Sequence, residues 1–252
     1  MKGALSLVLL LLMTGVALAD ESAEKAAAED TSAAAREVLE KADAAIKKVS
    51  AASFDVKSTP TGVAVNFRNP TEGRVVLSGW SDEMNIPVRM YADVRTERDG
   101  AEVRLTGGGN GDTFFIIDHG EKKGYEDMDP GVMGTGAGAI RGVAMLEFVH
   151  SAPFDDELGA EQLDLLADEK LGEDECHVVR VVYSGGRGES VWYFSKSDML
   201  PRRRLQKFTV PGQGEGALEI NLSNLVINPE LDPALFRMKL PAGYEQIDDF
   251  AP

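Results

Sequence analysis

Three segments near the end of the chain have the composition of β-strands, and residues that favour turns separate them. The segments are Val191–Ser195, Arg202–Val210 and Leu218–Val226. The first connection contains Ser-Asp-Met-Leu-Pro and the second contains Pro-Gly-Gln-Gly-Glu-Gly. Both are rich in residues that adopt turn conformations. The pattern therefore predicts three consecutive antiparallel strands, followed by a short helix over Pro233–Phe236 and an extended piece through Leu240–Tyr244.

Alternation with a period of two marks further strands in the middle of the chain. In Ile86–Val94 every second residue is apolar, and most of the positions between are polar or charged. This alternation is typical of a strand with one buried face and one wet face. Similar evidence predicts strands at the following positions, with a turn over Gly107–Asp112: Phe54–Val56, Val63–Phe67, Arg74–Ser78, Ala101–Thr106, Thr113–Asp118, Lys122–Asp127, Gln162–Asp168 and Glu175–Tyr183.

Two helices are expected beside these strands. Apolar residues recur at helical spacing in Ser32–Ser50, and a second helix is expected over Ala139–His150. The Gly-rich passage Gly131–Gly142 fails the spacing of a phosphate-binding loop and is interpreted as a flexible hinge or lid. About ten strands, two main helices and no repeated βαβ spacing predict an α+β fold with a mostly antiparallel sheet.

The N-terminus has the features of an export signal. Lys2 precedes an apolar run that ends in Ala17-Leu18-Ala19, which predicts a signal peptide over 1–19 with cleavage after Ala19. No Cys lies near that site, so a lipoprotein anchor is not expected. We expect an acidic, Ala-rich, disordered leader over 20–31 and one domain over 32–252. The mature chain is expected to be periplasmic or secreted, without an integral membrane segment.

The order of motifs in the last third resembles the end of the LolA-like superfamily of bacterial envelope proteins. The resemblance rests on an aromatic strand, the turn Leu200-Pro201-Arg202, a long strand that ends near Asn228-Pro229, a Leu-Asp…Phe segment at 231–236, and Pro241-Ala-Gly-Tyr244. It extends over roughly Ala35–Tyr244. The resemblance implies a strongly curved, incomplete antiparallel barrel capped by helices. It also implies shuttling of lipoproteins or lipids, and many relatives are uncharacterised exported proteins.

Composition and motifs restrict the chemistry. The net charge of −16 argues against nucleic-acid partners, and against attachment to anionic lipid by charge alone. The sequence has no nucleophile elbow, and its three histidines lie far apart, so neither an enzyme, a metal nor a cofactor is expected. The lone Cys176 is interpreted as a buried small hydrophobe, with a reactive thiol as the alternative. Asp155–Glu157 is interpreted as a solvated loop, with weak Ca²⁺ binding as the alternative.

Large aromatic residues and methionines are the candidate ligand-binding set. A curved sheet under thin helices leaves an apolar interior that can hold a lipid or the acyl chains of a lipoprotein, and Met adapts to flexible ligands. Arg202 and Arg204 are candidates for contact with a headgroup or a partner. The alternative is a regulatory or scaffold module of the cell envelope that binds a partner protein, with an enzyme third. The predicted cavity residues are Trp80, Met90, Phe115, Met145, Phe148, Trp192, Phe194 and Phe208.

Overall fold

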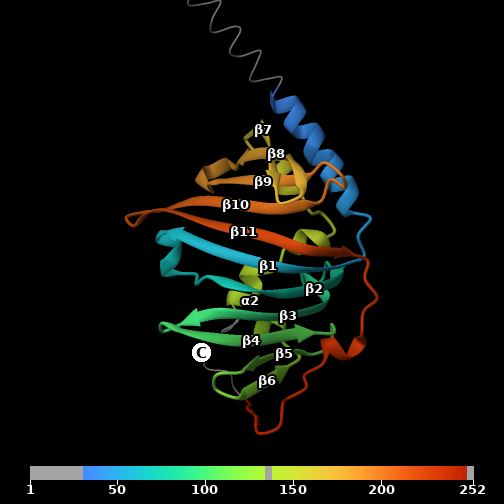
Figure 1. Ribbon diagram of the computed structural model, residues 1–252, viewed down its shortest axis with the longest axis vertical. Helices are drawn as coiled ribbons and strands as arrows, with labels where there is room; N and C mark the ends of the chain where they lie inside the picture. Colours follow the sequence, from blue (N-terminus) through green and yellow to red (C-terminus); the bar gives the residue numbers. More distant parts are fainter. Residues whose placement is uncertain (1–30, 134–137, 249–252) are drawn as a thin grey trace, which may run out of the picture.

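One continuous sheet organises the part of the chain that the structure describes. The structure is a computed structural model, and it describes residues 31–133 and 138–248. Twelve strands occur in the order β12-β6-β5-β4-β3-β2-β1-β11-β10-β9-β8-β7 (Figure 1). Neighbours are antiparallel, except that β12 runs parallel to β6. The strands are β1 (Ala51–Gly62), β2 (Thr71–Ser81), β3 (Ile86–Arg98), β4 (Ala101–Gly109), β5 (Phe114–Asp118), β6 (Lys123–Asp127), β7 (Gln162–Leu171), β8 (Asp174–Val182), β9 (Glu189–Ser195), β10 (Pro201–Val210), β11 (Gly214–Ile227) and β12 (Glu245–Gln246).

The two faces of the sheet differ as the alternation predicted. Successive side chains of a strand point to opposite faces. Phe54 of β1, Met90 of β3 and Trp192 of β9 belong to one large buried apolar cluster, and we call the face that carries it the inner face. Charged residues such as Asp93 and Arg104 alternate with these and lie on the other, outer face.

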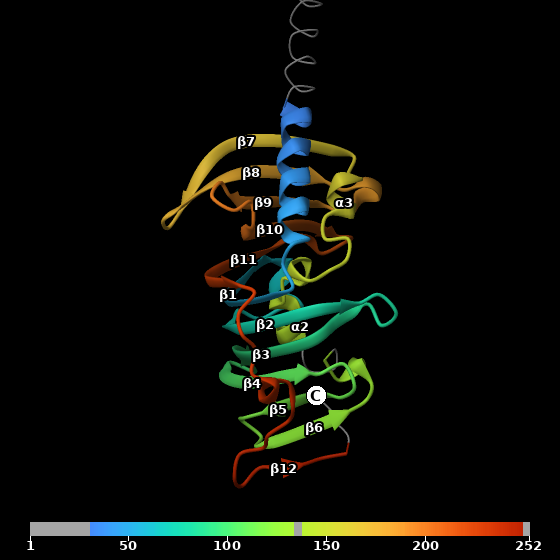
Figure 2. The ribbon, with the colours of Figure 1, turned by 90° about the vertical axis from the view of Figure 1, so that its right-hand side faces the viewer.

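Helical segments cover the inner face. The helix over 31–46 buries Ala35, Leu39, Ala42 and Ile46, and Figure 2 shows it in front of β7 to β10. Further along the sheet, α2 (Gly138–Val143) contacts β1, β2 and β3. The connection from α2 to β7 contains the 3-10 helix η3 (Leu146–Phe148) and the short helix α3 (Asp155–Leu158). We refer to residues 144–160 as the cover segment.

The C-terminal segment returns along the sheet to its far edge. After β11 it forms the 3-10 helix η5 (Pro233–Phe236), which contacts β3 and β4 and buries Phe236. The chain then adds β12 beside β6, where the Tyr244 hydroxyl lies 3.0 Å from His119 Nδ1. Three further short 3-10 helices are η1 (Val63–Asn66), η2 (Pro130–Met133) and η4 (Ser184–Gly186).

Some predicted elements were wrong. Val63–Phe67 is not a strand, because Gly62 turns the chain with φ 59° and η1 follows. Gly107–Gly109 belong to β4 rather than to a turn. The helix expected over Ala139–His150 is interrupted near Met145, whose ψ of 81° is not helical. The N-terminal helix ends at residue 46 rather than at Ser50.

The predicted fold class is confirmed in its main features. The sheet is curved, open and mostly antiparallel, and the last three long strands fall where the sequence placed them. The predicted signal peptide, residues 20–30 of the leader and residues 134–137 of the Gly-rich passage lie outside the described residues. Residue 31 belongs to the N-terminal helix, and the described parts of Gly131–Gly142 belong to η2 and α2. No helix within residues 31–133 and 138–248 combines the length and hydropathy that a membrane crossing needs.

Candidate functional site

An aromatic cluster lies on the inner face at β9, the third strand from one edge of the sheet. Trp192 and Phe194 project from β9 with their rings stacked, 5.9 Å apart at 10°. Phe154 of the cover segment meets both rings edge-on, each at 5.4 Å. All three side chains are fully buried. This edge-on packing is the arrangement that aromatic pairs prefer, so the cover segment is closely fitted to the sheet at this point.

The cover segment supplies two more of the predicted residues. Met145 and Phe148 are fully buried, and the Phe148 ring lies 5.4 Å from that of Phe54 in β1. Met90 belongs to the same buried cluster. Trp80 is half-buried against that cluster, with its ring 4.2 Å from His150. The structure therefore brings six of the eight predicted residues together, in contact with protein atoms: Trp80, Met90, Met145, Phe148, Trp192 and Phe194.

Phe115 and Phe208 lie apart from this cluster. Phe115 alternates with the inward-facing Phe114 and Ile116, so it is buried on the other side of β5. There its ring lies so close to Gly108 that a Cβ on that glycine would be 2.9 Å from it. Phe208 lies opposite Gly216 on the inner face, near the end of β10, and is only half-buried.

A cavity of about 700 Å³ opens beside Phe208. Its wall contains Tyr183 and Phe208 together with Val182, Glu189, Lys207 and Ala217, which the strand pairing places on the outer face. Tyr183 also packs against the inner cluster. Gly188 allows the strands to approach closely here, because a Cβ on it would be 2.2 Å from the Lys207 carbonyl oxygen. The volume falls within the usual range for small-molecule sites, about 300–1,000 Å³. The cavity thus lies open at the end of β10, and Tyr183 is the residue of its wall that packs against the inner cluster.

A partly buried ion pair connects the cover segment to the sheet. Arg204 Nη1 donates to Glu147 Oε1 at 2.7 Å, and the two side chains are 21% and 18% exposed. The Arg204 guanidinium also lies over the Trp192 ring, 5.1 Å from its centroid. Arg204 Nε and Trp192 Nε1 are buried and have no hydrogen-bond acceptor among the described residues. In this conformation the Arg204 side chain therefore contacts Glu147 and Trp192 of the protein itself, rather than a headgroup or a partner.

A second polar pair lies nearby. The Tyr183 hydroxyl donates to Glu157 Oε1 at 2.7 Å, and Glu157 is 7% exposed. Burial raises the pKa of Glu157 above its usual value, against the opposing effect of the Tyr183 hydrogen bond. Burial and the neighbouring Glu157 also raise the pKa of Tyr183. Asp155–Glu157 is therefore not simply a solvated loop, since its last residue points into the protein.

Sequence reasoning missed both polar pairs. One signal was present, because Glu147 interrupts the apolar run Met145–Val149, as a charge with a buried partner does. No comparable signal marked Glu157, whose burial depends on how α3 meets β8.

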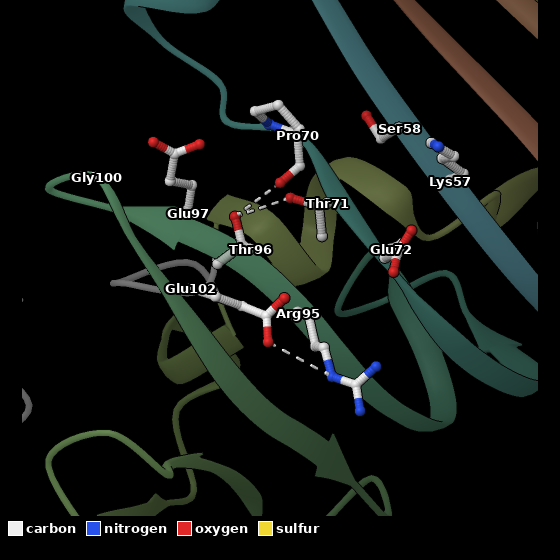
Figure 3. Close-up of a pocket in the computed structure, with 10 residues that line it drawn as sticks. All are labelled: Lys57, Ser58, Pro70, Thr71, Glu72, Arg95, Thr96, Glu97, Gly100 and Glu102. Atoms are coloured by element: carbon white, nitrogen blue, oxygen red, sulfur yellow. Dashed lines mark hydrogen bonds and ion pairs between the residues drawn. The ribbon is translucent and has the colours of Figure 1, made fainter.

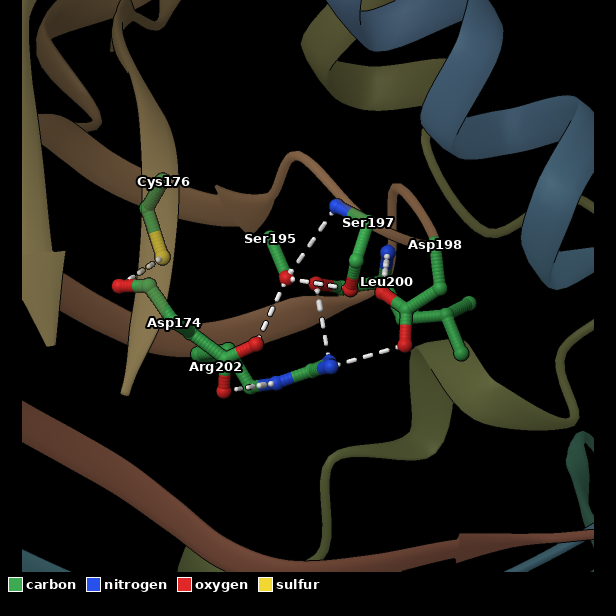
Figure 4. A network of polar contacts seen from close by, with 7 residues as sticks. All are labelled: Asp174, Cys176, Ser195, Ser197, Asp198, Leu200 and Arg202. Carbon is green, nitrogen blue, oxygen red and sulfur yellow. Dashed lines mark hydrogen bonds and ion pairs between the residues drawn. The ribbon is translucent and has the colours of Figure 1, made fainter. Parts of the chain in front are cut away.

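Arg202 takes part in a separate network (Figure 4). Its Nε lies 3.0 Å from Asp174 Oδ2 and its Nη2 lies 2.7 Å from Asp198 Oδ2. Although burial opposes it, hydrogen bonding to these carboxylates raises the pKa of Arg202. The pairing of β10 with β9 shifts between Pro201 and Arg203, and Arg202 and Arg204 bind different carboxylates. The two arginines therefore do not form a common site in this conformation.

The same region contains Cys176, which is fully buried. Burial, reinforced by the nearby charge of Asp174, raises the pKa of its thiol to about 11. A thiol protonated at neutral pH is a poor nucleophile.

Another hollow has a mainly polar wall. A cavity of about 420 Å³ near the ends of β1 to β4 has Arg95, Glu97 and Glu102 in its wall (Figure 3). Arg95 pairs with Glu102 at 3.9 Å, and the Thr96 hydroxyl donates to the Pro70 carbonyl oxygen. These groups bind one another rather than converge on a common point. The described residues include no cluster of three or more potential metal ligands.

No known family profile and no curated protein matches the chain. Solved structures do match it. LprF from Mycobacterium bovis is 12% identical with a TM-score of 0.53, over 85% of this chain and 99% of LprF. Lipoprotein LppX from Mycobacterium tuberculosis is 11% identical with a TM-score of 0.48, over 79% and 97%. A chain of the Pseudomonas aeruginosa MucA/MucB complex is 11% identical with a TM-score of 0.44, over 81% of this chain and 61% of that chain.

At these identities the comparison concerns the fold alone, and among these three the likeness to LprF is strong enough to use. The alignment covers 85% of this chain and nearly all of LprF, so the similarity is not confined to one hairpin. Together with the curved, open sheet, it confirms the resemblance that the C-terminal motifs indicated. The chain has a LolA-like fold.

Proposed function

We propose that this chain is an exported, non-enzymatic protein that binds an apolar ligand, a lipid or the acyl chains of a lipoprotein, on the inner face of its sheet. The observation that carries the proposal is the cavity beside Phe208. It is large enough for part of an acyl chain, its wall offers Val182, Tyr183, Phe208 and Ala217 beside charged residues, and Tyr183 packs against the buried apolar cluster of the inner face. Each buried CH₂ contributes about 0.8 kcal/mol, so binding there needs no catalytic group.

An acyl chain that reaches the aromatic cluster needs more room than this cavity offers. The adjoining space is filled by Phe148, Phe154 and Trp192, which are fully buried. The cover segment consists of short helices and loops, and a helix of four residues such as α3 has little stability of its own. We propose that the ligand enters beside Phe208 and displaces part of the cover segment, whose two polar pairs set the cost of opening.

Ligand binding can be tested with a fluorescent fatty acid in solution. We expect saturable binding, quenching of tryptophan fluorescence, and at least about tenfold weaker affinity for Phe208→Asp, because a charge in an apolar wall must be desolvated. Val226→Asp is the matched control, since Val226 is 49% exposed and does not line this cavity. Native mass spectrometry of the protein purified from its host should also show bound lipid. The proposal is wrong if the wild-type protein carries no lipid and takes up no probe.

The dense packing of the inner face favours a second candidate, a regulatory or scaffold module that binds a partner protein. In that case the aromatic cluster is an ordinary core. A specific partner should then be recovered from the cell envelope, and its binding should be the same for Phe208→Asp and for wild type. Lipid binding without any partner would count against this alternative.

A further inference from the structure

The turn between β1 and β2 presents apolar side chains to solvent. Val65 is 53% exposed and Phe67 is 51% exposed, and they lie two residues apart on and just after η1. We call Val63–Phe67 the apolar tip. It lies at the left of Figure 1, at the same end of the sheet as the β3–β4 and β10–β11 turns. Single exposed hydrophobic residues are common on protein surfaces, but two on one turn form a local apolar surface.

The conformation of the apolar tip is fixed. The backbone N–H groups of Phe67 and Arg68 donate to the Ala64 carbonyl oxygen at 3.0 and 2.9 Å. Ala64 itself is fully buried, close to β11, where a Cβ on Gly216 would lie 2.7 Å from the Ala64 nitrogen. Val65 and Phe67 are thus held outward on an anchored turn. Binding through them requires little further ordering of the backbone, and this lowers the entropic cost.

The segment that carries the apolar tip differs in charge from the chain as a whole, although Glu97 and Glu215 of neighbouring strands lie close to it. The stretch Ser58–Thr71 contains no acidic residue, although the chain has 42 of them, and Arg68 is its one charged side chain. Two exposed methionines at the opposite end of the sheet have acidic neighbours in the sequence. Met84 follows Asp82-Glu83, and Met128 lies between Asp127 and Asp129.

We propose that the apolar tip docks on a lipid bilayer, with Val65 and Phe67 in the interface and Arg68 at the level of the headgroups. A stable protein–protein interface buries about 1,200–2,000 Å², which two side chains on a convex turn do not provide. A few apolar side chains are sufficient for weak, reversible attachment to a membrane, and a basic residue beside them suits the headgroup region. The net charge of −16 opposes attachment by charge alone, so the apolar contact must carry the binding.

The position of the apolar tip connects docking with ligand exchange. Val63 packs against Gly216, which lines the cavity beside Phe208. On the other side, Phe67 and Arg68 line a cavity of about 200 Å³ that reaches Val143 of α2. Docking rests on the exposed tip itself. The further step, that a docked protein exchanges an apolar ligand with the bilayer, rests on the proposed function.

Vesicle flotation of the mature chain tests the docking. Phosphatidylcholine vesicles, with and without phosphatidylglycerol, are the probe. We expect the wild-type protein to float with phosphatidylcholine at both low and high salt. Val65→Asp/Phe67→Asp should lower the partition coefficient at least about tenfold, and the uncharged Val65→Ser/Phe67→Ser nearly as much, because both remove the apolar contact. Met128→Asp changes a residue that is 77% exposed and should have less than about a twofold effect.

The outcomes separate docking from ligand binding. Circular dichroism and urea unfolding verify that the variants are folded, as expected for exposed positions. The tip variants should still bind the fluorescent fatty acid from solution, whereas Phe208→Asp should float normally. The docking proposal is overturned if the wild-type protein does not float, if Met128→Asp loses as much as the tip variants, or if the tip variants float unchanged. Loss of a protein partner, rather than of vesicles, would make the apolar tip a protein-docking surface instead.

Discussion

Removing the ion pair between Glu147 and Arg204 should both destabilise the protein and ease opening of the inner face. The pair spans 2.7 Å with about a fifth of each side chain exposed. Breaking a fully buried pair by removing one partner costs about 3–5 kcal/mol, and exposed pairs contribute about 0–1 kcal/mol. Because the two side chains are partly exposed, we expect Glu147→Gln to lower the free energy of unfolding by about 1–3 kcal/mol. For Arg204→Met we expect a similar loss, partly through the contact of Arg204 with the Trp192 ring, which contributes about 0.5–2 kcal/mol.

A double-mutant cycle isolates the interaction between the two side chains. Urea unfolding of the wild type, the two single variants and the double variant should give a coupling free energy of about 1–2 kcal/mol. The same variants should take up the fluorescent fatty acid faster, because the cover segment opens at lower cost. Glu175→Gln is a suitable control, since its nearest cation, Lys196, lies at 3.8 Å and both side chains are more exposed. A coupling below about 0.3 kcal/mol, the level at which independent sites add, would refute the argument that this pair fastens the cover segment.

Three further predictions concern stability and reactivity. Because the pKa of Glu157 is raised on folding, the native state holds this proton at a pH where the unfolded chain has lost it, so this group's contribution to stability should fall as pH rises above 4.5. Glu157→Gln should remove that decline in a series of urea unfolding curves, and an unchanged pH dependence would contradict it. Gly73→Ala should destabilise the protein by about 1–3 kcal/mol, since the new Cβ would lie 2.2 Å from the Asp93 carbonyl oxygen. Thermal unfolding measures the loss, and Gly142→Ala is the control, because no atom lies closer than 3.8 Å to its Cβ position. Cys176 should react with a thiol reagent only after unfolding, because its thiol is fully buried with a raised pKa; rapid labelling of the native protein would contradict this.

Strand positions were predictable from sequence where one face of the strand is buried, because apolar and polar residues then alternate along the strand. The alternation in Ile86–Val94 predicted β3, and the turn residues before Arg202 and Leu218 predicted β10 and β11. The same rule failed at Val63–Phe67, where alternating apolar residues lie on a turn and two of them face solvent. Alternation cannot separate these cases, since the backbone of Gly62, rather than the side chains, decides where β1 ends.

The candidate site was less accessible to sequence reasoning. Residue type and strand parity were enough to place Trp192 and Phe194 together on the inner face. They were not enough to separate Phe115 from Phe114, because both faces of β5 are buried. The carboxylate partners of Arg202 and Arg204 could not be predicted from the sequence either. Glu147 lies 57 residues from Arg204, and only the path of the cover segment brings them together.

The polar pairs bear on the cost of the opening that the proposed function requires. If apolar contacts alone held the cover segment, the free energy of opening would rise in proportion to the apolar area that opening exposes to water. The cover segment also depends on Arg204 and Glu157, and each of these groups can be satisfied by water once it is exposed, so part of the cost of opening is recovered by solvation. An acyl chain that enters beside Phe208 from a bilayer would lower the free energy of opening further, because it replaces apolar contacts that the cover segment loses. Under the proposed function, the packed conformation is the ligand-free state, and the polar pairs set part of the free energy that a ligand must supply to open it.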